Sequence, residues 1–378
     1  AKVNGTLDKI AHRAVRSCGG SLPLIPVMFF FLAFVFGSIG PGSIASAALI
    51  GPMAMTVATQ IGIPAFPMAI MVANGANSAS LSPIGPTGII VNAIFEKIGL
   101  PAVPWMNYFI VFTAHAIVAF AGYAIFGGWK IFRKAGTARE ARRAGLEVRR
   151  AGLEVQDPPY IATGHGKVPN GDVTDAMRPF EWRHWLTLAV IIALITGVIF
   201  FGMNVGMAAL AGSVILVLAN ATDEGQALRS MPWGPILMVS GVTVLIAMIE
   251  KTGGIDLFSA ILASLSTPTS VTAVVAFIAG SISIYSSTSG VVLPAFLPTV
   301  PGLVERLGGG DVLPVAWAMI VGAHLVDVSP LSTTGALCIA AAQNTDIRKL
   351  FRQMLAWGMS MAVVAAIGCY IVFGLLWR

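Results

Sequence analysis

Charged side chains are scarce in this sequence. Asp, Glu, Lys and Arg make up 11% of its 378 residues, whereas a soluble protein of this length would carry roughly twice that share. Hydrophobic residues account for 56%. Long apolar segments with few charges are what a bilayer accommodates. The composition therefore disfavours an ordinary soluble domain and indicates a multi-pass membrane protein.

Cysteine and enzyme motifs are also lacking. The three cysteines, Cys18, Cys338 and Cys369, are odd in number and show no metal-binding spacing, so they indicate small core residues rather than disulfides. The sequence contains no Walker A motif, no H-E-x-x-H and no dinucleotide fingerprint. We therefore expect no enzyme and no cofactor, and an active transporter of this sequence would use an ion gradient or substrate exchange.

A seven-residue phrase occurs twice, 247 positions apart. Residues 82–88 read S-P-I-G-P-T-G, and residues 329–335 read S-P-L-S-T-T-G. Shorter matches follow in the same order, among them Gly37-Ser38-Ile39 with Gly280-Ser281-Ile282. Helix-breaking residues inside apolar segments free backbone groups that must face protein or a water-filled cavity. Matching interruptions in two halves of a chain indicate a duplication and the binding site of a transporter.

The predicted fold is an all-α polytopic membrane protein with two inverted-topology repeats. Each repeat has a re-entrant helical hairpin and a broken transmembrane helix. We expect a partial first repeat at 1–129, a basic linker at 130–183 and a complete second repeat at 184–378. The first repeat would comprise an interfacial helix at 8–18, a hairpin at 22–58 broken at Gly40–Ser43, a helix at 64–97 broken at Ser82–Gly88, and a helix at 105–128.

The second repeat begins with three additional apolar segments, at 184–203, 205–221 and 232–250. It continues with an amphipathic stretch at 255–265, a hairpin at 269–300 broken around Tyr285–Gly290, a helix at 312–343 broken at Ser329–Gly335, and a last helix at 353–376. The first repeat lacks counterparts of the three additional segments. We expect these scaffold helices upstream in the natural protein, the alternative being their natural loss.

The linker concentrates the basic side chains, and within it the phrase RRAGLEV occurs at 142–148 and again at 149–155. A basic tract can bind nucleic acid or anionic lipid, but a cytoplasmic connector that obeys the positive-inside rule is the favoured interpretation. This orientation predicts a bacterial-type inner (plasma) membrane protein whose C-terminus is periplasmic. We expect contact with membrane lipid and none with nucleic acid.

Hydroxyl and amide side chains cluster at the hairpin tips and helix breaks, where neither half places a Lys or Arg. An anion could bind there because the N-termini of half-helices present free N–H groups and positive dipole ends. The freed carbonyls suit a small hard cation. The alternative is that these hydroxyls only pack between helices.

His324 and Asp327 are the one ionisable pair predicted deep in the bilayer, where a charge costs at least about 2.5 kcal/mol. Their i, i+3 spacing places them on one helix face. Asp327 is interpreted as a cation ligand or proton carrier with His324 as its partner, or the two form a structural hydrogen bond. A third option joins them to a serine such as Ser286 for hydrolysis, although no nucleophile-elbow spacing supports it. His115, alone in an apolar segment, is interpreted as a packed polar residue in preference to a relay.

The order of hairpin, broken helix, linker, hairpin and broken helix, with G-P-G-S at 40–43 and S-P-I-G-P-T-G at 82–88, resembles the MatC-type dicarboxylate carriers. These belong to the ion transporter superfamily, alongside the divalent anion/sodium symporters. The resemblance covers all but residues 135–178. In the sodium symporters each hairpin tip carries Ser-Asn-Thr, which contacts sodium and the substrate carboxylates. This chain has Gly42-Ser43-Ile44 and Ser286-Ser287-Thr288 instead, so Asp327 is the candidate substitute ligand or proton site.

The resemblance implies a secondary active transporter that carries a small dicarboxylate, such as malonate, succinate or malate, in symport with Na⁺ or H⁺. It implies substrate-binding residues at Gly42, Ser43, Ile44, Pro86, Thr87, Ser287, Thr288, Thr333 and Thr334. The candidates for cation or proton coupling are Ser38, Asn77, Ser82, Ser286, His324, Asp327 and Ser329. Alternatives are a carrier of another small anion, a channel, or an intramembrane enzyme that uses Ser, His324 and Asp327. The oligomeric state stays open, with a homodimer as one option.

Overall fold

The computed structural model describes residues 23–128 and 181–377, apart from residue 41 and short gaps at 202, 204, 230–236, 238–240, 242–243, 245–246, 250 and 343–344. Every regular element within these residues is helical, as the all-α prediction requires. The expected interfacial helix at 8–18, most of the span at 232–250 and linker residues 130–180 lie outside the described part of the chain.

The first repeat consists of a hairpin, a broken helix and a long final helix. Its elements are α2 (Leu24–Ser38), α3 (Gly42–Ile61), α4 (Ala65–Ser78), α5 (Pro86–Lys97) and α6 (Pro104–Tyr123), the last continued by the π-helical turn η1 (Ala124–Gly128). The tip between α2 and α3 is tight. Gly40 and Gly42 adopt φ angles of +136° and +79° there, a region that glycine populates without steric cost.

The second repeat has the same order. Its elements are α13 (Gly254–Ser264), α14 (Val271–Ser283), η2 (Thr288–Val292), α15 (Leu293–Phe296), η3 (Leu297–Thr299), α16 (Val300–Arg306), α17 (Val312–Leu325), α18 (Thr333–Ala340), α19 (Ile347–Cys369) and η4 (Tyr370–Leu376). The chain bends by 120° between α14 and the segment 288–306, which forms the predicted re-entrant hairpin. The second arm is split into short helices because α15, η3 and α16 each have a proline in the first turn.

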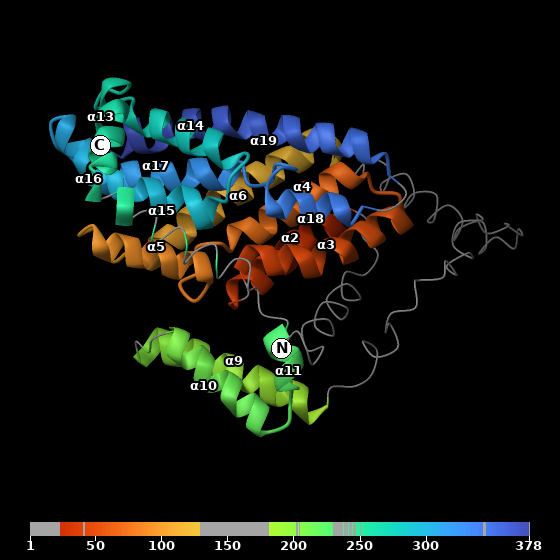
Figure 1. Cartoon of the computed structure of the whole chain (residues 1–378). Coiled ribbons are helices and arrows are strands. Elements are labelled where there is room, and N and C mark those ends of the chain that lie inside the picture. The colour runs from red at the N-terminus through yellow and green to blue at the C-terminus, as the bar shows by residue number, and fades with distance from the viewer. Residues whose placement is uncertain are drawn as a thin grey trace, which may run out of the picture.

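Figure 1 shows the inverted relation of the two repeats. The path from α4 to α5 and the path from α17 to α18 run in opposite directions, as do α6 and α19. Two scaffold helices, α9 (Trp182–Phe201) and α10 (Val205–Leu218), pack against each other. With the short α11 (Glu224–Arg229) they lie apart from the main body in this view. α9 begins within the last two residues of the predicted linker.

Three helical segments in the described part of the chain are long and apolar enough to cross a membrane. The bent pair that forms the hairpin would make a fourth if it were counted as one span. The last of the three starts earlier than the predicted residue 353. Asp346 caps α19 by accepting a hydrogen bond from the Lys349 backbone N–H at 3.0 Å, which satisfies an N–H that would otherwise lack a partner. Arg348 and Lys349 are therefore in the first helical turn and not in a loop.

The two broken helices occupy the centre of the fold. Residues 66–78 of α4 and residues 314–325 of α17 are buried on all sides. Matching glycines allow this packing. A Cβ on Gly75 would collide with the Phe30 carbonyl oxygen in α2, and a Cβ on Gly322 would collide with the Ala276 carbonyl oxygen in α14. The duplication seen in the sequence thus produces two equivalent helix crossings.

Candidate functional site

Each broken helix is interrupted by seven residues. α4 ends at Ser78 and α5 begins at Pro86, while α17 ends at Leu325 and α18 begins at Thr333. Each break therefore lies three residues earlier than predicted, at 79–85 instead of 82–88 and at 326–332 instead of 329–335. Pro86 starts a helix readily because its missing N–H has no partner at that position anyway. The last three residues of each S-P-x-x-x-T-G phrase form the first turn of the next helix.

Asn77 joins the two breaks directly. Its Nδ2 donates to the backbone carbonyl of Asp327 at 3.2 Å, and its Oδ1 accepts from the Thr334 hydroxyl at 3.2 Å. The side chain is 0% exposed. Because Asn77 belongs to the first repeat and its two partners belong to the second, the breaks of both repeats meet at one place in the centre of the protein.

Each hairpin tip contacts the broken helix of its own repeat, at the break or beside it. In the first repeat the Ser82 hydroxyl donates to the Ser38 carbonyl at 2.7 Å, and a Cβ on Gly42 would lie 3.3 Å from Cδ of Pro86. In the second, the Thr288 hydroxyl donates to the Ala323 carbonyl at 3.2 Å. Two tips and two breaks therefore form one polar junction inside an apolar protein.

Asp327 is the ionisable side chain closest to this junction. It is partly buried and directly follows α17. The hydroxyls of Ser332 and Thr288 lie beside its carboxylate, and Ser332 also donates to the Asp327 backbone carbonyl at 2.6 Å. A carboxylate surrounded by hydroxyls and a freed carbonyl is an arrangement of oxygens that suits a hard cation.

His324 does not bond to Asp327. Its Nδ1 donates instead to the Ile320 carbonyl, one turn back in α17, at 2.9 Å. The ring is buried, with 2% exposure. The expected hydrogen bond between the two side chains is therefore not the arrangement found. Each has partners of its own, so a mutual structural bond does not explain their presence.

The predicted substrate-binding residues all lie at N-terminal ends of helices. Gly42, Ser43 and Ile44 begin α3, Pro86 and Thr87 begin α5, Ser287 caps η2 ahead of Thr288, and Thr333 and Thr334 begin α18. Helices from opposite repeats adjoin here, because α18 packs against α3 and α5 packs against α15. Such N-termini offer N–H donors and positive dipole ends without any cationic side chain.

The two half-helix N-termini differ in capping. At α18, the Ser332 hydroxyl accepts from the Gly335 N–H at 3.3 Å. At α5 the corresponding position is Gly85, which has no side chain, and no side-chain cap is present. The first turn of α5 therefore keeps a donor that a ligand could use, whereas the equivalent donor of α18 is already engaged.

Two of the predicted coupling residues lie less centrally. Ser329 is fully buried against α19, where a Cβ on Gly358 would lie 2.7 Å from the Ser329 Cβ. Its hydroxyl accepts from the Leu331 N–H at 3.3 Å, within its own turn. Ser286 lies at the second hairpin tip and is partly exposed. Neither side chain makes a hydrogen bond to Asn77, Asp327 or Thr334.

Tyr108 and His115 make polar contacts near the site that the sequence did not predict. The Tyr108 hydroxyl lies 2.7 Å from the Ser38 hydroxyl, so α6 also supports the first tip. His115, interpreted as a packed polar residue, bonds through Nδ1 to Asn74 Oδ1 at 2.8 Å. A polar side chain in an otherwise apolar helix is the one signal that marks both residues, and it does not reveal their partners.

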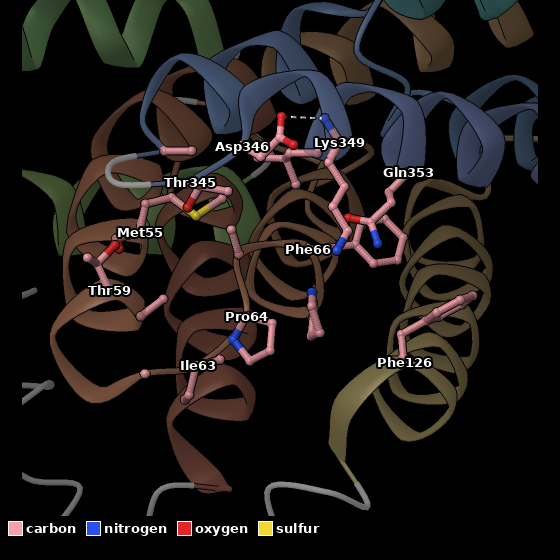
Figure 2. Close-up of a pocket in the computed structure, with 16 residues that line it drawn as sticks. Met55, Thr59, Ile63, Pro64, Phe66, Phe126, Thr345, Asp346, Lys349 and Gln353 are labelled. Atoms are coloured by element: carbon pink, nitrogen blue, oxygen red, sulfur yellow. Dashed lines mark hydrogen bonds between the residues drawn. The ribbon is translucent and has the colours of Figure 1, made fainter.

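A cavity of about 480 Å³ lies elsewhere, at the end of the molecule where α3, α4 and α19 meet. Figure 2 shows the Lys349 side chain reaching from α19 into this pocket towards Phe66. None of the predicted site residues lines it. This cavity is therefore distinct from the polar junction at the breaks.

The fold and the junction define a membrane transporter with two inverted repeats. The family model described as citrate transporter (CitMHS) matches residues 2–322, and the chain belongs to this family. The protein is accordingly a secondary carrier of citrate- or dicarboxylate-type anions in the ion transporter superfamily, and it is not an enzyme. No curated protein matches the sequence. The MatC-type specificity stays a prediction.

Proposed function

We propose that this protein is a symporter that moves a small di- or tricarboxylate across the plasma membrane, driven by a cation gradient. The observation that carries the proposal is the contact of Asn77 with Asp327 and Thr334. It brings together the breaks of two inverted repeats, and breaks in that position are where secondary transporters bind substrate and coupling ion.

The anion would bind at the N-termini of α3, α5 and α18. Each helix N-terminus carries the equivalent of about half a positive charge, so the three together offset about one and a half of the negative charges of a di- or tricarboxylate, and a bound cation would offset more. The side chains at these ends are small or carry hydroxyls, which allows the backbone to approach a ligand closely. The family description favours citrate, and the resemblance in sequence favours a dicarboxylate of three or four carbons.

The coupling cation would bind at Asp327. Sodium prefers oxygen ligands, which the Asp327 carboxylate, nearby hydroxyls and carbonyls freed by the break supply. A proton would need the carboxylate or a neighbouring imidazole. In either case the cation site lies within the second repeat, and Asn77 connects it to the first. We also propose that residues 130–183 are cytoplasmic and that α19 runs outwards from that side.

Uptake by the full-length protein in proteoliposomes tests the proposal. Labelled citrate, malonate, succinate and malate would be supplied separately under an inward sodium gradient, an inward proton gradient or no gradient. We expect one of these anions to accumulate against its own gradient under one of the two ions. No accumulation of any of them above protein-free liposomes would contradict the proposal.

A further inference from the structure

His115 is fully buried in α6, and one of its ring nitrogens has no partner. Nδ1 lies 2.8 Å from Asn74 Oδ1, but Nε2 is buried and forms no hydrogen bond with any residue that the structure describes. An unpaired buried polar atom costs about 1–3 kcal/mol, and native structures contain few of them. We therefore expect Nε2 of His115 to bind a partner that is not a protein atom.

The hydrogen bonds fix which nitrogen carries the hydrogen. The Asn74 Nδ2 donates to the Ile70 carbonyl at 2.9 Å, which turns its Oδ1 towards His115. An amide oxygen can only accept, so Nδ1 of His115 must donate and Nε2 holds a lone pair. The same reasoning applies to His324, whose Nδ1 donates to the Ile320 carbonyl. Both imidazoles therefore have Nε2 as an acceptor.

The two histidines are neighbours from opposite repeats. α6 packs against α17, and the rings are close enough for a charge on one to repel a charge on the other. Among the helices that contact α6, α17 contributes only His324, and α2, α4 and η1 carry no titratable side chain. Glu96 and Lys97 lie at the far end of α5. A proton on one ring therefore disfavours a proton on the other.

A polar path connects this pair to the junction. Asn74 and Asn77 are three residues apart on α4 and so share a face. Asn74 contacts His115, while Asn77 contacts Asp327 and Thr334. On the other side, His324 lies one turn before Asp327. His115 is thus connected to the proposed substrate site through Asn74 and Asn77, and His324 is connected to it through Asp327.

We infer that His115 and His324 form a single-proton site that couples transport to the proton gradient, an inference that rests on the proposed function. A proton from bulk water adds to an Nε2 lone pair, Nδ1 keeps its hydrogen, and the proton leaves from the same nitrogen on the opposite side of the membrane.

Burial explains why proton and anion would travel together. A buried imidazolium without a counter-charge is strongly unfavourable, and a carboxylate substrate at the adjacent junction supplies that counter-charge. Linkage then requires that the proton favours the anion as much as the anion favours the proton. The loaded carrier would hold both or neither, which is the requirement for tight symport.

His115→Asn tests the inference in proteoliposomes of the full-length protein. The Asn amide can still donate to Asn74 from the position of Nδ1, but Nε2 is removed. We expect exchange of labelled for unlabelled substrate at saturating concentration to persist without a gradient but to lose its dependence on pH, while proton-driven accumulation falls about tenfold or more. His324→Asn should behave alike, and the matched control His184→Asn, in scaffold helix α9, should change neither.

The outcomes separate this inference from the proposed function. Normal exchange together with undiminished proton-driven accumulation in His115→Asn would overturn the inference alone, as would accumulation by the wild type that depends only on sodium. No exchange by the wild type would overturn both. Calorimetry of substrate binding to the wild type in two buffers of different ionisation enthalpy needs no variant. Proton uptake on binding is expected, and its absence would overturn the inference.

Discussion

The break between α4 and α5 and the break between α17 and α18 are related by the 247-residue repeat, yet they are not chemically equal. Matching glycines allow close backbone approach in both copies. Gly75 and Gly322 allow the helix crossings, and a Cβ on Gly88 or Gly335 would collide with the carbonyl oxygen of Ser82 or Ser329. The backbone path has been kept in both copies because any side chain at these positions would meet backbone atoms.

The polar positions differ. Asn77 in the last turn of α4 corresponds to His324 in the last turn of α17, and Ser80 in the first break corresponds to Asp327 in the second. The second copy therefore has His324 and Asp327 at positions where the first copy has the uncharged Asn77 and Ser80. The comparison indicates that both copies supply the backbone geometry of the site, while the second copy supplies its ionisable His324 and Asp327.

The largest effect is expected from Asp327→Asn. The amide nearly preserves the shape of the side chain but can neither neutralise a bound cation nor carry a proton, so gradient-driven uptake should fall about tenfold or more. Ser80→Ala, at the equivalent position of the first break, should leave uptake within about twofold. Initial rates in proteoliposomes under sodium and proton gradients would check both. Full activity of Asp327→Asn under both gradients would remove the proposed asymmetry.

Stability should respond equally in the two copies. Gly75→Ala and Gly322→Ala each force a methyl group into backbone atoms of a neighbouring helix, at a cost of about 1–3 kcal/mol or more. Gly368→Ala in α19 is the matched control, because no atom lies within 4 Å of its Cβ position. Thermal unfolding in detergent should show a lower midpoint for the first two variants only. A tolerated alanine at Gly322 would mean that the second crossing is looser than described.

The link between the copies should appear as non-additivity. Asn77→Ala and Thr334→Val each remove the hydrogen bond between these side chains, and the double variant should lose about 0.5–1.5 kcal/mol less than the sum of the two. Asn77→Ala alone should cost more than Thr334→Val, since it also leaves the Asp327 carbonyl unpaired. A double-mutant cycle on thermal stability gives the coupling. If the two effects on stability were strictly additive, the two side chains would not interact.

The smallest effect concerns the caps. Ser332→Ala should cost about 1 kcal/mol of stability through loss of the α18 cap. Gly85→Ser would introduce the same cap at α5, where a Cβ fits tightly at 3.3 Å from the Ser82 carbonyl oxygen. If the α5 N-terminus holds a substrate carboxylate, Gly85→Ser should raise the KM for uptake a few-fold. An unchanged KM with an intact fold would assign the anion to the other helices.

Sequence patterns predicted the repeat, the hairpins and both breaks because Pro and Gly disrupt helices locally. Both breaks were misplaced by three residues, since Pro86 and a capping Ser332 start helices as effectively as they end them. The early start of α19 was missed for a similar reason. In the sequence, an Asp before a basic stretch is typical of a loop. The structure shows instead that Asp346 accepts a hydrogen bond from the Lys349 N–H and caps the helix.

Side-chain partners could not be predicted in the same way. The i, i+3 spacing of His324 and Asp327 suggested a mutual bond, but each side chain found backbone and hydroxyl partners that are equally close in space. The contacts of Asn77 join residues 250 and 257 positions away, and no local rule gives that distance. The roles of the site residues, the domain boundaries and the coupling ion stay predictions.

The most direct test of the central claim is an experimental structure of the full-length protein with its transported carboxylate bound. We predict the anion at the junction of the two breaks, with its carboxylates at the N-termini of α3, α5 or α18 and within reach of Thr87 or Thr333. A ligand bound only in the pocket between α3, α4 and α19, beside Lys349, would contradict this and would make the polar junction a structural feature.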